Sequence, residues 1–518
     1  MLEPDGTLTW SIAAVSSTAA DPGTSEHRTS RHPPYALKQA SVEGVQLPDG
    51  LIAVVKRDCP TCVAVVPVLE QLAAATELTV VTQDDPDWPE HVTRLDDTSL
   101  ELSWHLQVHT VPTLVKVEAG VEVARTEGWL RPSWEALSGV AGLGPELPEH
   151  RPGCGSRSVE WGVEDELKRR YGGRVLASRQ VELADLEDEV EAAYSRGWTD
   201  GLPVVPPTEA RVLRMLTGTS RDPAEVVAVV PPDLVECTVE KVAVNAVLAG
   251  CLPEYLPVVL TAVEAACTDA FNAHGLLATT YFSSPVVVVN GPLARAIGMN
   301  SGGNALGQGN RANATIGRAL QLVIRNVGGG RPGEIDRAAL GNPGKYTFCF
   351  AEAEDGSPFE PLHVSRGADP GSSAVTLFAG AGVSPVVDQR SRTPQSLVRT
   401  FALALRAVAH PKLALAFDAM LVVCPEHGRV LREAGWDRSR LLTELEPLLQ
   451  LSPEDLRRGA AGIDEGMPPG LDLTPLPKFR LGGLLVVHAG GTAGMFSAVI
   501  GGWASGQSGS EPVTKEIR

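Results

Sequence analysis

The sequence predicts an α/β protein with two domains, the second larger and built on a mostly parallel or mixed sheet. Short apolar runs alternate with helix-like segments over residues 34–142 and again over residues 210–504. The runs in the second region lack polar alternation, which is typical of strands buried on both faces. A chain of 518 residues also exceeds what one ordinary hydrophobic core covers, so we expect more than one domain.

Composition excludes several classes of protein. The 43% apolar and 21% charged residues are typical of a soluble globular chain. No run approaches the roughly 18 apolar residues of a membrane span, and no basic segment followed by an apolar one marks a secretory signal. A net charge of −19 disfavours nucleic acid and anionic membranes as partners. We therefore expect a cytoplasmic protein with no nucleic-acid or membrane partner.

The N-terminal third changes character at about residue 34. Residues 1–33 are rich in Ser, Thr, Ala, Pro and Gly and show no period, which predicts a flexible leader. The first domain follows, and its expected strands are residues 51–56, 78–82, 108–117 and 121–126, with helices at 63–75, in a run ending at Leu106, and around Trp134.

Cys59 and Cys62 form the one suggestively spaced pair among eight cysteines, which are too few for a disulfide scaffold. They stand in Asp58-Cys-Pro-Thr-Cys62, between a predicted strand and a predicted helix. A cysteine at a helix N-terminus has its thiolate stabilised by free N–H groups, which lowers its pKa. Half of a zinc site has the same spacing, but no second Cys-x-x-Cys follows. The Cys-x-x-Cys spacing alone is therefore a weak signal, and its surroundings decide its interpretation.

With the strand before this motif, the helix after it and Val111-Pro-Thr about fifty residues downstream, residues 34–142 resemble the thioredoxin fold. The resemblance implies that Cys59 is an exposed nucleophile and Cys62 a buried resolving thiol. It also implies a cis peptide bond at Pro112 that faces the dithiol. The family's usual Trp before the motif is absent, and Arg57-Asp58 stands in its place.

The next two segments separate the domains. Residues 143–157 are dense in Gly and Pro and predict a linker, in which Cys154 either has no role, shuttles between the dithiol and the second domain, or caps a metal. Residues 158–209 predict a polar helical segment with a solvated acidic face, followed by a rigid proline-rich loop.

The second domain supplies strand ends, where open α/β sheets bind their ligands. A tail is expected at residues 505–518. The expected helices are residues 238–249, 255–267, 314–327, 394–409 and 429–434, and the expected strands are residues 285–290, 345–351, 374–378, 419–424 and 484–488.

A glycine- and asparagine-rich loop at residues 300–318 runs into one of these helices. Such residues tolerate positive φ and present backbone N–H groups at a helix start, which is how proteins hold anionic or carbonyl oxygens. The Gly490-Gly491 turn after the last apolar strand has the same character, although it matches neither a P-loop nor a dinucleotide fingerprint. The predicted substrate-binding residues are Asn300, Asn304, Asn310, Arg311, Lys345, Gly490 and Gly491.

Two further clusters carry acid, base or nucleophile chemistry. Glu352 and Glu354 lie on one side of an extended segment with His363 nearby, which suits acid/base work or a hard divalent metal, or else marks solvated acids. His274 is either an acid/base group or structural. Cys424-Pro-Glu-His427 repeats the order strand, Cys, Pro, helix, so Cys424 is either a nucleophile with His427 as partner or a buried cysteine.

Residues 197–518 also resemble a domain of uncharacterised bacterial proteins loosely associated with the UGSC (seleno)protein group. The shared features are Trp198-Thr-Asp-Gly-Leu-Pro-Val-Val-Pro-Pro-Thr, Gly309-Asn-Arg-Ala-Asn-Ala-Thr-Ile-Gly-Arg, Asn342-Pro-Gly-Lys-Tyr and Pro425-Glu-His. No intact UGSC motif is present, and Cys154-Gly-Ser-Arg is at best a remnant of it. The resemblance implies no particular reaction.

Three functional hypotheses follow. The first is a thiol–disulfide oxidoreductase in which Cys59 and Cys62 serve a larger domain that binds a small anionic or carbonyl substrate, with a thiol reductant or reductase as partner. The second is a hydrolase or lyase, thiol-dependent and with or without a divalent metal, whose thiol the first domain keeps reduced. The third is a non-catalytic ligand-binding module. A homo-oligomer is compatible with each.

Overall fold

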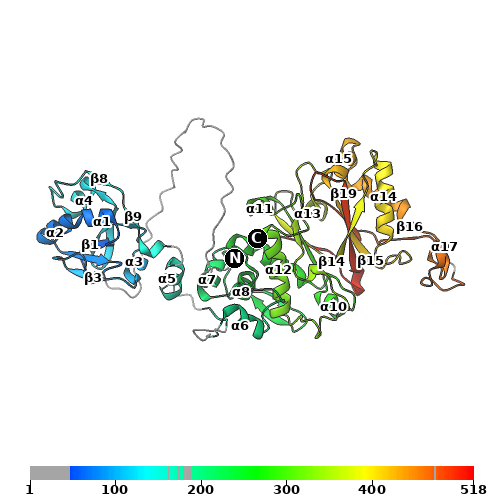
Figure 1. Ribbon diagram of the computed structural model, residues 1–518, viewed down its shortest axis with the longest axis horizontal. Helices are drawn as coiled ribbons and strands as arrows, with labels where there is room; N and C mark the ends of the chain where they lie inside the picture. Colours follow the sequence, from blue (N-terminus) through cyan, green and yellow to red (C-terminus); the bar gives the residue numbers. More distant parts are fainter. Residues whose placement is uncertain (1–46, 161–162, 172–175, 179–180, 182–187, 472–473) are drawn as a thin grey trace, which may run out of the picture.

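The computed structural model describes residues 47–518 except 161–162, 172–175, 179–180, 182–187 and 472–473. The predicted leader, residues 1–33, lies outside the described residues, as does much of the predicted acidic face. Within the described part, helices accompany two larger sheets that mix parallel and antiparallel pairing, which is consistent with the α/β class. Figure 1 shows the two sheets at opposite ends of the molecule.

The N-terminal sheet has the strand order β3-β2-β1-β5-β6 among the described residues. β1 runs parallel to β2 and antiparallel to β5, and β6 continues the antiparallel edge. The strands are β1 (Gly50–Val55), β2 (Leu78–Thr82), β3 (Arg94–Asp96), β5 (Thr113–Glu118) and β6 (Val121–Glu127), and the helices are α1 (Pro60–Ala64), α2 (Val66–Ala75), α3 (Glu101–His105) and α4 (Arg131–Ser138).

Two predicted elements of this sheet are interrupted by proline. The helix expected at 63–75 consists of α1 and α2, because Pro67 lacks the N–H that would continue the hydrogen-bond ladder. The strand expected at 108–117 consists of β4 (Thr110–Val111) and β5, and the Val111–Pro112 peptide bond between them is cis, as the resemblance implies.

The segment predicted as a linker, residues 143–157, is folded onto the N-terminal sheet instead. It contains β8 (His150–Arg151), which pairs with β7 (Trp129–Leu130), and β9 (Cys154–Gly155), which pairs with β4. Its glycines serve close packing, because a Cβ at Gly153 would lie 2.3 Å from Thr110 Cγ2 and 2.8 Å from Val111 O.

Short helices follow this segment. α5 (Val163–Tyr171) contacts α3 of the N-terminal sheet and α7 (Glu209–Leu216), which packs on α8 (Val239–Ala249). The proline-rich loop is held to a later helix by Arg318, whose guanidinium donates two hydrogen bonds of 2.8 Å to Asp200. Other elements here are η1 (Arg157–Val159), α6 (Glu189–Ser195), β10 (Val226–Val230) and β11 (Val235–Thr238).

The C-terminal sheet has the order β13-β12-β14-β19-β15-β18, and β20 also pairs with β14 among the described residues. β13 is parallel to β12 and β18 is parallel to β15, but the pairings in the middle are antiparallel, so the sheet is mixed. The strands are β12 (Ser284–Asn290), β13 (Cys349–Ala351), β14 (Ala374–Val387), β15 (Phe417–Val423), β18 (Leu484–His488), β19 (Phe496–Ala504) and β20 (Val513–Glu516).

The sheet repeats one arrangement twice. In the first half, β12 leads through helices to its parallel neighbour β13 and then to the antiparallel strand β14. In the second half, β15 leads through helices to the parallel strand β18 and then to the antiparallel strand β19. Each central strand also ends just before a helix that begins with proline, at Pro292 and at Pro425. The antiparallel pair β14–β19 joins the two halves.

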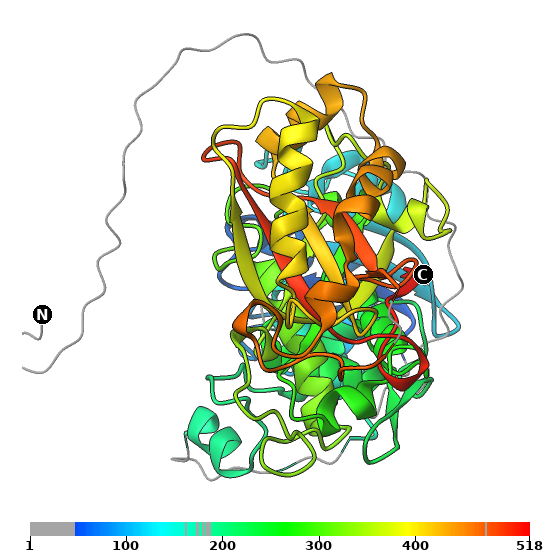
Figure 2. The ribbon, with the colours of Figure 1, turned by 90° about the vertical axis from the view of Figure 1, so that its right-hand side faces the viewer.

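Alternate residues of the strands separate into an inner core and two outer cores. Val286 and Val288 of β12 join Met420 and Val422 of β15 in one buried cluster, with Phe350, Phe378 and Ile500. The intervening residues face helices: β12 packs against α8, α9 and α12, whereas β15 packs against α14, α15 and α16. Figure 2 shows α14 lying across the outer face of the second half.

The remaining C-terminal elements are short or lie at the periphery. The helices are α9 (Leu256–Ala266), α10 (Ala273–Ala278), α11 (Pro292–Ala296), α12 (Arg311–Asn326), α13 (Leu362–Ser365), α14 (Pro394–Arg406), α15 (Pro425–Glu433), α16 (Arg438–Leu445) and α17 (Pro453–Leu456), and the small strands are β16 (Gln450–Leu451) and β17 (Leu476–Pro477). None of the helices in the described ranges combines the length and the apolar character that crossing a membrane requires.

Three predicted elements differ from the observed ones. The strand expected at 345–351 is reduced to β13, because η3 (Pro343–Lys345) occupies its start. The strand expected at 374–378 extends to Val387, because β14 pairs first with β12 and then with β19. The expected tail contains β20, which pairs with β14.

Gly317 tests the packing of α12 on the sheet. A Cβ at this position would lie 2.5 Å from Thr347 Oγ1 and 3.0 Å from Cys349 Cβ. Alanine normally stabilises a helix interior, but here Gly317→Ala is expected to lower the free energy of unfolding by about 1–3 kcal/mol through overpacking. Chemical denaturation measures this, with Thr315→Ala on the same helix as a control. A stabilised Gly317→Ala protein would contradict the close approach of α12 to β13.

Candidate functional site

Cys59 and Cys62 lie at the start of α1, directly after β1. Cys59 is the N-cap residue of α1, and its Sγ accepts a hydrogen bond of 3.4 Å from the Cys62 backbone N–H. The Cys59 thiol also lies 3.7 Å from the carbonyl oxygen of Val111, the residue before the cis proline Pro112. The structure thus brings together the three positions that the sequence selected for redox chemistry.

The two thiols of the pair have opposite proton affinities. The pKa of Cys59 is lowered to about 5, first by the hydrogen bond from the Cys62 thiol, and then, against burial, by the Cys154 thiol and the N–H groups of Cys62 and Thr61. Burial, together with the hydrogen bond to Cys59, raises the pKa of Cys62 far above its usual range. At neutral pH, Cys59 is therefore a thiolate and Cys62 a thiol.

The expected exposure of Cys59 is wrong. Its exposed fraction is 0%, as is that of Cys62. Residues 152–155 lie beside the pair: Thr61 Oγ1 donates a hydrogen bond of 2.8 Å to the carbonyl of Pro152, and Cys154 pairs with Val111. The sequence placed Cys154 in a linker, and the structure places it next to the dithiol.

The acidity of Cys59 is directly measurable. In the reduced protein, the ultraviolet absorbance of the Cys59 thiolate, taken as wild type minus Cys59→Ser, is expected to rise with a midpoint at about pH 5. Below this pH the thiol is protonated, and nucleophilic reactivity is lost with it. Cys62→Ala removes the donor of the largest stabilising contact and is expected to move the midpoint toward the ordinary cysteine value. A midpoint near the ordinary value in wild type would refute the assigned geometry.

A second cluster lies at the carboxyl ends of β12 and β13. Glu352 is buried and accepts hydrogen bonds from Asn290 Nδ2 at 2.7 Å and from the Leu362 N–H at 2.6 Å. Arg438 lies 3.8 Å from its other oxygen. Burial nevertheless raises the pKa of Glu352 above its usual range. Glu354 accepts from Asn290 Nδ2 and from the Gly291 N–H, so Asn290 links the two carboxyl groups.

The end of β18 joins this cluster to the second half of the sheet. His488 N–H donates to Glu352, and the His488 carbonyl accepts from the Ala353 N–H at 2.7 Å. Two residues later, Gly490 passes beside Cys424: a Cβ at Gly490 would lie 3.9 Å from Cys424 Cβ. The Gly490 N–H also donates to the Ser301 carbonyl of the glycine-rich loop. Segments that the sequence analysis selected separately therefore meet at one end of the sheet.

This end of the sheet contains a small acidic cavity of about 200 Å³. It is lined by Glu352, Glu354, Asp355, Arg295 and Ser301, among others. Among the described residues, the buried atoms Asn290 Oδ1 and His488 Nε2 in this region lack a hydrogen-bond partner.

Cys424 caps α15 after β15, in the same local arrangement as Cys59. Its N–H donates to Ser497 Oγ at 3.1 Å, and Ser497 Oγ lies 2.7 Å from His427 Nδ1. His427 Nε2 lies 2.9 Å from the Asp388 carbonyl oxygen, which can only accept, so Nε2 carries a proton. The free base position of the neutral imidazole is therefore Nδ1.

The cysteine and histidine stabilise each other's charged forms. Burial is the largest single influence and would raise the pKa of Cys424, but the interactions with the His427 side chain and N–H and with Ser497 together outweigh it, and the pKa is lowered. Burial alone would lower the pKa of His427, but contact with Cys424 and with the Asp388 carbonyl raises it. The pair has the polarity of an activated thiol.

This activation depends on the imidazole. His427→Gln is expected to raise the pKa of Cys424 above its ordinary value, because the imidazole no longer opposes the effect of burial on the thiolate. Thiolate absorbance, taken as the difference from Cys424→Ser in the same background, measures it. Ser497→Ala, which removes a weaker contact, is expected to raise the pKa of Cys424 less. An unchanged pKa in a folded His427→Gln protein would show that the two residues are not coupled.

The asparagine side chains of the glycine-rich loop form hydrogen bonds with the backbone of the loop and its surroundings. Asn300 bonds to the backbone of Gly302 and Gly303, Asn304 bonds to the Gln308 carbonyl, and Asn310 caps α12 and donates to the Gly298 carbonyl. Arg311 is exposed and donates to the Gly250 carbonyl. Ala305 is buried in the inner core, so the loop closes one end of that core.

Asn313 is the residue of this loop that the sequence analysis missed. It is buried in the first turn of α12, accepts from the Asn300 N–H and donates to the carbonyls of Asn300 and Ala305. Its position as the third residue of a capped helix was the available signal, because an Asn there can reach back to the loop.

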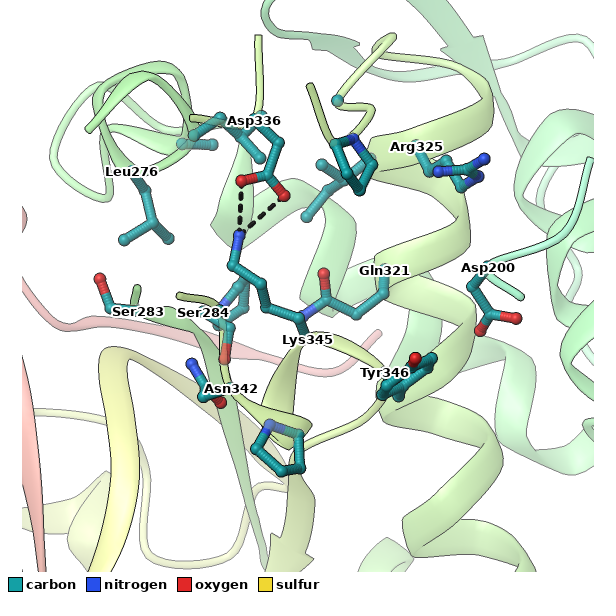
Figure 3. Close-up of a pocket in the computed structure, with 18 of the residues that line it drawn as sticks. Asp200, Leu276, Ser283, Ser284, Gln321, Arg325, Asp336, Asn342, Lys345 and Tyr346 are labelled. Atoms are coloured by element: carbon teal, nitrogen blue, oxygen red, sulfur yellow. Dashed lines mark hydrogen bonds and ion pairs between the residues drawn. The ribbon is translucent and has the colours of Figure 1, made fainter. Parts of the chain in front are cut away.

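Lys345 lies apart from the other predicted residues. It lines a cavity of about 450 Å³ near Ser284, at the amino end of β12, whereas the Glu352 cluster lies at the carboxyl end. Lys345 Nζ donates hydrogen bonds of 2.8 Å to both oxygens of Asp336 (Figure 3). In the described structure, Ser283 Oγ, Ser284 Oγ and Arg325 Nε of the same lining are buried without a hydrogen-bond partner.

The two remaining histidine candidates differ in burial. His274 is exposed on α10, while its neighbours Ala273 and Leu276 line the 450 Å³ cavity. His363 is buried on α13, burial lowers its pKa, and neither ring nitrogen has a hydrogen-bond partner among the described residues. The described residues contain no group of three or more His, Cys, Asp or Glu side chains arranged to hold a metal ion.

Searches of protein-family models, of curated proteins and of solved structures found no match for this chain.

Proposed function

We propose that this protein is a thiol–disulfide oxidoreductase whose dithiol is Cys59 and Cys62, carried by a thioredoxin-like domain. One observation carries the proposal: the N-cap sulfur of Cys59 accepts the Cys62 N–H at 3.4 Å and lies 3.7 Å from the Val111 carbonyl oxygen, beside the cis proline. The lowered pKa of Cys59 and the raised pKa of Cys62 agree with this geometry. A nucleophile must be a thiolate at working pH, and a resolving thiol must not compete with it. The strand order and the cis Val111–Pro112 bond support the proposed fold.

The reaction takes two exchange steps. The Cys59 thiolate attacks one sulfur of a substrate disulfide, forms a mixed disulfide and releases the other sulfur as a thiolate. The Cys62 thiol then loses its proton and attacks Cys59 Sγ, which breaks the mixed disulfide and releases the second substrate thiol. The dithiol becomes a disulfide, one substrate disulfide becomes two thiols, and an external thiol reductant restores the dithiol.

The test is turnover of a simple disulfide. The reduced full chain, mixed with glutathione disulfide, is expected to release two equivalents of glutathione and form the Cys59–Cys62 disulfide. Cys59→Ser is expected to slow this release by about two orders of magnitude or more, because a hydroxyl is not ionised at neutral pH. Cys237→Ser, which changes a buried cysteine whose pKa is raised to about 12, is the matched control. Equal rates in wild type and Cys59→Ser would refute the proposal.

We further propose that the C-terminal sheet carries a separate domain that binds a small anionic or carbonyl substrate. The cavity beside Lys345 supports this better than the cavity beside Glu352, because the second one is lined by three acidic residues and a single basic one. Buried, unpartnered donors at Ser283, Ser284 and Arg325 suit the oxygens of such a substrate. Of the predicted binding residues, this assigns a ligand role to Lys345 alone.

A second candidate function is that of a thiol-dependent hydrolase or lyase with its nucleophile at Cys424. The observation that favours it is the Cys424–His427 pair, in which the imidazole Nδ1 lies within hydrogen-bond reach of Ser497 and can take a proton in this cluster. Figure 1 places α1 and α15 at opposite ends of the molecule, so this chemistry is independent of direct exchange with Cys59. Iodoacetamide labelling of Cys424 that abolishes consumption of a substrate, in a Cys59→Ser background, would support it.

A further inference from the structure

A third cysteine, Cys154, lies against the dithiol. β9 pairs antiparallel with β4, in a register that places Cys154 opposite Val111. Val111 is also the residue whose carbonyl oxygen lies 3.7 Å from Cys59 Sγ. The Cys154 thiol is near enough to that sulfur to stabilise the Cys59 thiolate, and the Cys59 charge in turn raises the pKa of Cys154.

On the N-terminal side of Cys154, contacts of Pro152 and Gly153 hold the segment close to the dithiol. Thr61, in the middle of Cys-Pro-Thr-Cys, donates a hydrogen bond of 2.8 Å to the Pro152 carbonyl. Gly153 lies against Thr110 and Val111 at a distance that leaves no room for a Cβ. Gly128, with φ of 67°, lies on the other side, where a Cβ would be 3.0 Å from the Gly153 N. Glycine at both positions lets the backbone reach the dithiol.

The C-terminal side is held by a buried polar network. Ser156 is fully buried, and Gln83 Nε2 donates to its Oγ at 2.7 Å. The Gln83 Oε1 accepts from the Arg157 N–H at 3.0 Å. Ser158 Oγ donates to the Val108 carbonyl at 2.7 Å, and the Ser156 N–H donates to the His109 carbonyl. Satisfied buried networks fix a unique geometry, so Cys154 is held in position between two anchors.

We propose that Cys154 is a third redox residue of this site, which forms a disulfide with Cys59 in exchange with Cys62. This inference rests on the proposed dithiol function and adds a residue to it. Residues 152–155 lie against the Cys59 side of the pair, so the chain's own Cys154 stands next to the sulfur that reacts with a substrate disulfide. Cys154 is thus placed to act as an alternative resolving thiol.

The exchange balances without an added oxidant. Starting from a Cys59–glutathione mixed disulfide, the Cys154 thiol loses its proton and its thiolate attacks Cys59 Sγ. The Cys59–glutathione bond breaks, glutathione leaves as a thiolate that takes up the proton, and a Cys59–Cys154 disulfide forms. The Cys62 thiol then attacks Cys59 Sγ in the same way, which gives the Cys59–Cys62 disulfide and the free Cys154 thiol. The negative charge of Cys59, which raises the pKa of Cys154, is absent once Cys59 is in a disulfide.

The test uses the full chain and removes Cys62. Reduced Cys62→Ser protein is mixed with glutathione disulfide, quenched with acid and mapped by mass spectrometry under non-reducing conditions. We expect a peptide pair joined through Cys59 and Cys154 and little retained glutathione. The matched control is Cys62→Ser with Cys154→Ser, in which the glutathione on Cys59 is expected to be lost at least about tenfold more slowly.

The outcomes separate this inference from the proposed function. If Cys62→Ser holds glutathione as long as the double variant does and no Cys59–Cys154 peptide forms, the inference is overturned, while Cys59-dependent turnover in wild type would still stand. If Cys59→Ser turns over like wild type, the proposed function itself fails. If Cys62→Ser does not fold, wild type equilibrated in glutathione buffers decides: a Cys59–Cys154 peptide at any ratio supports the inference, and Cys59–Cys62 alone at every ratio overturns it.

Discussion

The antiparallel pairing of β14 with β19 is the constraint on which the C-terminal sheet depends. It joins two halves that have the same topology. In each half a central strand pairs with a parallel strand on its outer side and with an antiparallel strand on its inner side. The two central strands, β12 and β15, then contribute to one inner core. The helices of each half pack on the opposite faces of these strands. As a result, the outer strands β13 and β18 approach each other at their carboxyl ends, where the Ala353 N–H reaches the His488 carbonyl. The Glu352 cluster and the Cys424 cluster are neighbours for this reason.

Much of this sheet could be predicted from the sequence, but its plan could not. The predicted ranges of β2 and β18 are the observed ones. A strand buried on both faces is a continuous run of apolar residues, and the ends of such a run mark the ends of the strand. The repeat was missed, because the two halves share only a strand followed by a proline-started helix, and the intervening segments differ in length. The loop at residues 300–318 was predicted to bind oxygens, yet its asparagine side chains bond to nearby backbone. Short amide side chains favour such local bonds, and a sequence pattern does not say which they make.

The N-terminal sheet shows the opposite case, in which the positions of the paired cysteines and the cis proline were predictable and their surroundings were not. The dithiol, its helix and the Val111–Pro112 segment were all expected, since each depends on residues close to it in sequence. The position of Cys154 depends on contacts with Thr61, Gln83 and Val111, which are far away along the chain. Glycine and proline around Cys154 suggest a linker by composition, but Gly153 is the residue that allows backbone to approach backbone.

Cys59 and Cys424, the two cysteines whose pKa is lowered, differ in the side chain found three residues later in the sequence. Cys59 and Cys424 each follow a buried strand and cap a helix that begins with proline, whereas burial alone raises the pKa of Cys237, Cys251 and Cys267 to about 12. At Cys59 the third residue is Cys62, a thiol that can stabilise the thiolate and then become oxidised with it. At Cys424 the third residue is His427, an imidazole that can exchange a proton but cannot form a bond to the sulfur. The same order of strand, cysteine and proline-started helix therefore places a second sulfur beside Cys59 and a proton acceptor beside Cys424.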